Sequence, residues 1–114
     1  MSLARVDAAH WVEHFAGLQA GGLVWFDFLT AVDRGGQLEV VARVADSTQT
    51  QSAMVATVVT DAIDSLTGIF PGAAWHERET MEMFGLAFTG LVDARPLLLG
   101  SLSGPPPLRK GSSA

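Results

Sequence analysis

The sequence contains no cysteine among its 114 residues, and this absence excludes several kinds of site at once. Without thiolates the chain can form no disulfide, no cysteine-ligated zinc or iron–sulfur site and no cysteine nucleophile. Basic residues are also few, because seven Lys and Arg stand against twelve Asp and Glu and give a net charge of -5. This balance argues against nucleic acid as a partner, since phosphate binding requires clustered basic side chains.

Long hydrophobic runs are missing as well. The longest apolar stretch, residues 21–26, stops at Asp27 and is far shorter than the ~18 residues that a membrane-spanning helix requires. The first residues lack the apolar stretch of a signal peptide. We therefore expect a soluble chain with no direct membrane span, whose association with any membrane goes through a partner.

What the chain does contain is enough apolar material for one core. Hydrophobic residues make up 48% of the sequence and charged residues 17%, a composition typical of a single globular domain. We expect that domain to occupy residues 1–100. Residues 101–114 hold three consecutive prolines among Gly and Ser, which predicts an extended C-terminal tail.

The hydrophobic pattern predicts three strands and three helices. The strands are rich in β-branched and aromatic residues or alternate apolar with polar positions, and they fall at residues 23–32, 37–45 and 53–59. The helices are expected at residues 7–19, from 60 or 61 to about 69, and 75–84. This order predicts a two-layer α+β fold, in which one mixed or mainly antiparallel sheet packs against two to three helices.

Local signals refine these expectations. Residues 23–32 are apolar over much of their length, so we expect that strand to be covered on both faces. Asp33-Arg34-Gly35-Gly36 predicts a hairpin turn. Thr60 or Asp61 can cap the second helix, and Gly85 is a natural end for the third, with one more short strand at residues 86–90.

The densest group of chemically active side chains lies in residues 75–85. A metal site would use His76, Glu79 and Glu82, but the zinc pattern His-Glu-x-x-His is absent, because position 80 is Thr. The simplest alternative is a helix with surface charges, in which Glu77 and Glu79 occupy the first turn. The large apolar residues beside them favour instead a charge network closed against a core or a partner.

The run from Trp75 to Phe88 resembles the signature of the 30 kDa, or C-type, subunit family of NADH-quinone oxidoreductase, the respiratory complex I. That pattern is approximately Glu-Arg-Glu, two free positions, Asp, an apolar residue and Phe-Gly-Ile. The matching positions are Glu77, Arg78, Glu79, Phe84 and Gly85, with Glu82 in place of Asp. Further likenesses to the family lie downstream, at Asp93, Arg95, Arg109 and Lys110.

The resemblance implies a structural subunit without redox chemistry of its own. In this family the protein lies in the hydrophilic arm of a proton-translocating NADH:quinone oxidoreductase, in the cytoplasm at the inner face of the membrane. It lies beside the large D-type subunit that helps to form the quinone cavity, and it holds no flavin, cluster or quinone. We accordingly expect an enzyme only as a member of that complex, with no catalytic, cofactor or metal residues. The expected partner-docking residues are Trp75, Glu77, Arg78, Glu79, Glu82, Phe84, Gly85, Phe88, Asp93, Arg95, Arg109 and Lys110.

Two other functions remain open at this stage. One is an accessory subunit of a related membrane-bound hydrogenase-type complex, and the other is a free-standing metal- or ligand-binding domain built on Glu77, Arg78 and Glu79. Outside this segment, His10 and His14 have a spacing able to hold a metal, although a solvated helix face is the better explanation. Asp27 fits an edge position or a hydrogen-bonded carboxylate better than a perturbed acid.

Overall fold

The structure, a computed structural model, describes residues 3–91 of the chain. The predicted tail over residues 101–114 therefore lies outside the described residues. So do Asp93, Arg95, Arg109 and Lys110, which only the family resemblance supports as docking residues.

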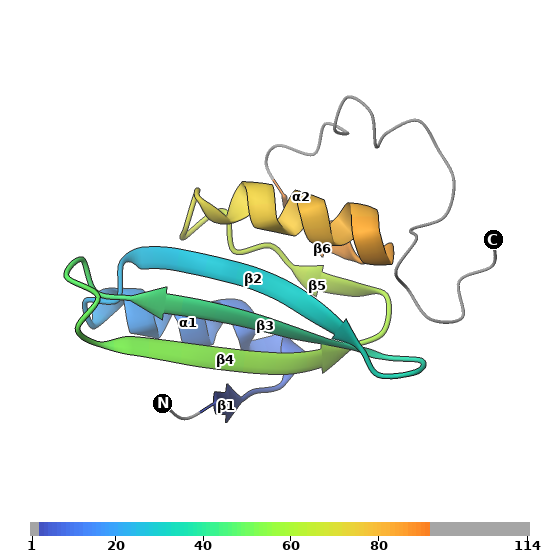
Figure 1. The fold of residues 1–114 in the computed structure, drawn as a ribbon, viewed down its shortest axis with the longest axis horizontal. Coiled ribbons are helices and arrows are strands. Elements are labelled where there is room, and N and C mark those ends of the chain that lie inside the picture. Colours follow the sequence, from blue (N-terminus) through green and yellow to red (C-terminus); the bar gives the residue numbers. More distant parts are fainter. Residues whose placement is uncertain (1–2, 92–114) are drawn as a thin grey trace.

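A four-stranded mixed sheet forms the main layer (Figure 1). Its strands are β1 (Leu3–Arg5), β2 (Trp25–Asp33), β3 (Leu38–Ala45) and β4 (Ser52–Val59), in the spatial order β1-β4-β3-β2. The pairs β2–β3 and β3–β4 are antiparallel hairpins, whereas β1 runs parallel to β4. The predicted α+β class and mixed sheet are confirmed, and the three exposed residues of β1 were too few to show a periodic pattern.

One face of the sheet is covered by the first helix, α1 (Trp11–Ala20), which follows a short 3₁₀ turn, η1 (Ala8–His10). Figure 1 shows α1 behind the sheet. Trp11 and Phe15 are fully buried and pack edge to face, with ring centroids 4.8 Å apart. They share a core with the inward side chains of β3, where the predicted alternation is confirmed: Leu38, Val40, Ala42 and Val44 are all fully buried.

The strand β2 differs from its prediction. It is an edge strand, and its burial alternates toward the end, with Leu29 and Ala31 buried and Thr30 and Val32 exposed. The expectation that both faces are covered is wrong for residues 3–91, because α1 covers the inner face and no described element forms a layer over the apolar outer residues. The register also shifts between Phe26 and Phe28, which marks a β-bulge.

A second, two-stranded sheet pairs β5 (Ala62–Asp64) with β6 (Ala87–Thr89) in parallel. The helix predicted from residue 60 or 61 to about 69 is therefore wrong. Ile63 is buried beside Phe88 in this small sheet, so strand pairing with a distant segment overrides the local helical pattern. The predicted short strand at residues 86–90 is confirmed by β6.

The last helix, α2 (Ala73–Phe84), confirms the helix expected at residues 75–84 and begins two residues earlier. It runs beside the edge strand β2 in Figure 1, and the Phe26 and His76 rings meet with centroids 5.5 Å apart. Gly85 ends the helix in the left-handed conformation, with φ 73°, and its N–H donates to the Met81 carbonyl. This turn directs the chain into β6.

The left-handed Gly85 gives a direct test of how α2 ends. Gly85→Ala should lower the free energy of unfolding by about 1–2 kcal/mol, because an L side chain is strained at that φ. Gly17→Ala is the matched control: a Cβ there meets nothing within 4 Å, so better helix propensity should raise stability by roughly 0.5–1 kcal/mol. Urea unfolding followed by circular dichroism measures both, and equal effects of the two substitutions would contradict the assignment.

Candidate functional site

The residues of the candidate segment divide between two sides of α2. Glu77 and Thr80 are buried, as are Phe84 at the end of the helix and Phe88 in β6. The opposite side carries Trp75, Glu79 and Met83, all exposed, with Trp75 at 55% and Met83 at 40%. Arg78 and Glu82 are half-buried. The segment thus has one side committed to the fold and one side facing outward.

Glu77 is the central residue of the buried side, with no exposed surface at all. Its Oε2 accepts a hydrogen bond from the Leu66 backbone N–H at 2.7 Å. Its Oε1 accepts from the Ser65 hydroxyl at 2.6 Å. Both carboxylate oxygens are therefore engaged by the loop that follows β5, and Glu77 fastens α2 to that loop.

The loop itself is organised around the same carboxylate. The Ser65 hydroxyl has one hydrogen atom, which it uses in the hydrogen bond to Glu77. The Thr67 hydroxyl must therefore be the donor in the 2.6 Å hydrogen bond between the Ser65 and Thr67 hydroxyls. The Thr67 N–H also donates to Ser65 Oγ at 3.0 Å. This chain of hydrogen bonds fixes the Ser65–Thr67 turn.

Burial raises the pKa of the Glu77 carboxyl above its ordinary value, and the hydrogen bonds from Leu66 and Ser65 oppose that shift only in part. The ionised form is thus disfavoured inside the protein, while two donors aimed at its oxygens limit the penalty. The arrangement suits a structural anchor, because both acceptor oxygens are already satisfied.

The structure corrects the predicted positions of Glu77 and Glu79, the two acidic residues of the family signature that the sequence predicts at the start of the helix. Since α2 begins at Ala73, no acidic residue lies in its first turn, and Glu77 is a buried anchor instead of a first-turn surface charge. Glu79 points to the exposed side. Glu77 and Glu79 therefore do not converge, and the geometry gives no support to a metal or ligand site built on Glu77, Arg78 and Glu79.

Sequence reasoning missed Ser65, Leu66 and Thr67, the partners of Glu77. Ser65 and Thr67 flank an apolar residue twelve and ten positions before the glutamate, and no local spacing rule links positions so far apart. The available signal was the large apolar residues that lie close to Glu77 in the sequence. The contact itself is created by the path of the chain through β5.

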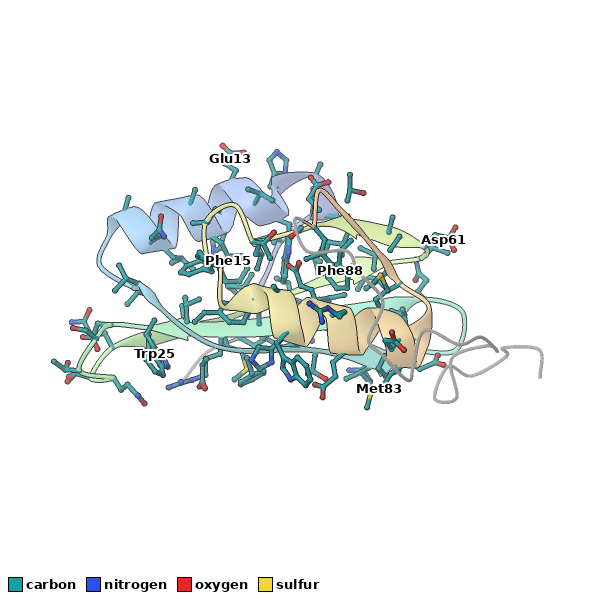
Figure 2. The ribbon with its side chains drawn as sticks, turned by 90° about the horizontal axis from the view of Figure 1, so that it is seen from above. Glu13, Phe15, Trp25, Asp61, Met83 and Phe88 are labelled. Atoms are coloured by element: carbon teal, nitrogen blue, oxygen red, sulfur yellow. The ribbon has the colours of Figure 1, made fainter. Side chains whose placement is uncertain are left out.

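The remaining candidates also have structural explanations. Asp27, at the bulge of the edge strand, forms an ion pair with Arg43 on β3, which confirms the expected edge position and partnered carboxylate. His10 of η1 and His14 of α1 line a shallow hollow together with Glu13, which points outward in Figure 2. Within residues 3–91, no group of three or more His, Asp or Glu side chains is arranged to hold a metal ion.

Among the described residues, no helix has both the length and the apolar character needed to cross a membrane.

The buried hydrogen bonds of Glu77 predict a large stability effect from its removal. Glu77→Ala leaves the Leu66 N–H without an acceptor and opens a void, and should lower the free energy of unfolding by roughly 2–3 kcal/mol. Glu79→Ala, two positions along the same helix but exposed, should change it by less than about 0.5 kcal/mol. Urea unfolding compares the two, and similar losses would show that Glu77 is not an anchor.

The raised pKa of Glu77 also predicts a pH dependence with a definite sign. Since the folded-state pKa lies above the ordinary value of 4.5, the stability that Glu77 contributes is fully present below that value and is lost as the pH rises through the folded pKa. Glu77→Gln does not titrate. The free energy of unfolding of the wild type minus that of Glu77→Gln should therefore fall as the pH rises above 4.5. A difference that rises with pH would contradict the assignment.

The matching family model and the relatives with similar sequences agree on one family. The family model described as the 30 kDa subunit of respiratory-chain NADH dehydrogenase matches residues 4–114. The C-type subunit of NADH-quinone oxidoreductase from Jannaschia sp. (strain CCS1) is 38% identical over 87 residues, which cover 72% of this chain and 42% of that protein. The chain thus spans less than half of that relative's length.

A second relative carries the combined letters C/D in its name. This C/D-type subunit of NADH-quinone oxidoreductase, from Cronobacter sakazakii (strain ATCC BAA-894), is 33% identical over 97 residues, which cover 85% of this chain but only 14% of that protein.

Two solved structures share the fold. The trypsin-resistant fragment 1–134 of Nqo5 superposes with a TM-score of 0.72 at 18% identity, covering 83% of this chain and 81% of that one. A chain of the membrane-bound sulfane sulfur reductase, an archaeal respiratory membrane complex, superposes with a TM-score of 0.71 at 25% identity. The match covers 77% of this chain and 56% of that one.

Proposed function

The chain belongs to the family of the 30 kDa subunit of respiratory-chain NADH dehydrogenase, and from this membership we propose that it is a structural, non-catalytic subunit of the complex. Its place is the hydrophilic arm of a proton-translocating NADH:quinone oxidoreductase, at the cytoplasmic face of the membrane. Its role is to hold the large protein that forms the quinone cavity in position, so that electrons pass from NADH to quinone through other members of the complex.

The observation that carries this proposal is the division of α2 into two sides. The central carboxylate of the signature is engaged internally, because both oxygens of Glu77 accept hydrogen bonds from the chain's own loop. What α2 offers outward is apolar surface at Trp75 and Met83. Exposed Trp and Met beside charged residues are typical of protein–protein contacts.

The choice of partner is supported by the relative from Cronobacter sakazakii, whose name assigns one polypeptide to the C-type and D-type subunits together. Two segments that are joined in one chain in a relative are expected to lie close together when they are separate chains. We therefore take the D-type subunit as the principal partner of this chain.

A related membrane-bound redox complex is the second candidate, since a chain of the sulfane sulfur reductase, an archaeal respiratory membrane complex, has the same fold. The family model and the relatives from Jannaschia and Cronobacter are all named for NADH dehydrogenase or NADH-quinone oxidoreductase. These names favour the NADH-linked complex.

Deletion of the gene, with complementation by variants, tests the proposal. Loss of the chain should abolish NADH:quinone activity of the membranes, while NADH oxidation with an artificial electron acceptor should persist, because flavin reduction takes place in other members of the complex.

Trp75→Ala should weaken the association of the chain with the D-type subunit by about 2 kcal/mol, the usual loss for an anchoring Trp. Co-purification and native electrophoresis measure assembly.

Glu13→Ala, on the exposed side of α1, is the control and should assemble normally. Full assembly of the complex without this chain, or loss of NADH oxidation by an assembled complex, would refute the structural role.

A further inference from the structure

The outer face of the four-stranded sheet, opposite the face that α1 covers, is unusually apolar for the outside of a protein. Leu3, Trp25, Val32 and Val58 project from it with exposed fractions of 37%, 50%, 40% and 47%. Half-buried Phe28 and Val41 lie on the same face. We call the surface formed by these six residues the open sheet face.

The strand registers show that this surface is continuous. Val58, Glu39 and Val32 lie opposite one another on three adjacent strands, β4, β3 and β2. Figure 2, which looks from above, places Trp25 on the side of the molecule away from α1 and Phe15, and Met83 of α2 lies on that same side. The open sheet face therefore adjoins the outward side of α2.

A cluster of charges stands within this apolar surface. The Glu39 carboxylate, almost fully buried, accepts from Arg34 through Nη2 at 2.5 Å and Nε at 3.1 Å, and pairs with Arg5 at 3.2 Å. The hydrogen bonds from Arg34 hold the pKa of the Glu39 carboxyl below its ordinary value. The Glu39 carboxylate thus pairs with two guanidinium groups. The Arg5 side chain is 65% exposed and the Arg34 side chain is 57% exposed.

The second ion pair on this face joins Arg43 to Asp27 and carries no net charge. The Arg5–Glu39–Arg34 cluster therefore leaves one net positive charge on the open sheet face, although the whole chain carries -5. Such a surface is complementary to an apolar surface that carries a carboxylate. The carboxylate of a partner can accept hydrogen bonds from the Arg5 and Arg34 donors that Glu39 does not use.

We propose that the open sheet face is a docking surface for a different polypeptide, one that presents an apolar patch with an Asp or Glu opposite Arg5 and Arg34. The inference rests on the proposed role as a structural subunit and adds the surface and the chemistry of the partner. A second copy of the chain fits less well, because the carboxylates of Glu39 and Asp27 on this face are already paired and would offer the arginines no new acceptor.

A photo-cross-linking amino acid at position 58 in the intact complex tests which molecule lies over the face. The expected product is a cross-link to another protein of the complex, at a segment with apolar residues and a nearby Asp or Glu. The same cross-linker at Ala16, exposed on α1, is the control and should give no such product. A cross-link between two copies of this chain, or no cross-link at position 58, would overturn the proposal.

Charge substitutions test the same surface independently. Val58→Glu and Arg5→Glu should reduce co-purification with the partner by about tenfold or more, because each places a carboxylate against an apolar or acidic partner surface. Ala16→Glu is the matched control and should have no effect. Thermal unfolding of each purified chain shows whether the variant still folds, and the cross-linking result decides the question if one of them does not.

The outcomes separate this inference from the proposed function. If the wild-type chain co-purifies with the complex and the folded sheet variants do so equally well, the open sheet face is not the docking surface, while the structural role remains. If the wild-type chain does not co-purify with other members of the complex, both are refuted.

Discussion

The buried carboxylate of Glu77 is the interaction on which the second half of the structure depends. It accepts hydrogen bonds from Leu66 and Ser65 and so joins α2 to the loop after β5. Burying an ionisable group is costly unless its oxygens are satisfied, and here two donors meet it directly. Without this anchor, α2 would be joined to the β5–β6 sheet through apolar packing and the turn at Gly85.

The anchor also determines what is left for function. With Glu77, Thr80 and Phe84 turned into the fold, the exposed residues of α2 include Trp75 and Met83. On the same side of the molecule, the outer face of the sheet has no covering layer among the described residues. A domain with an apolar side is suited to bind other proteins, and this is the role that we propose for the chain.

Much of the first half of the fold could be predicted from local pattern. The turn at residues 33–36 contains two glycines with positive φ and an Asp33 side chain that accepts from the Gly35 N–H, as the turn residues indicate. The alternation in β3 and the end of α2 at Gly85 are equally local. The helix predicted after β4 failed, because residues 62–64 pair with residues 87–89. No local pattern in residues 62–64 indicates this distant pairing partner.

The sequence by itself determined the α+β class, the paired strands and the segment that carries the family signature, since periodicity, turn residues and motif spacing are local properties of the chain. Only the tertiary structure decided that Glu77 is buried while Glu79 is exposed, and that Trp25 and Val32 of β2 face outward. The physical reason is that burial depends on which distant segments pack against a residue. Helical spacing fixes the angle between two side chains, but the neighbours of the helix decide which of them meets solvent.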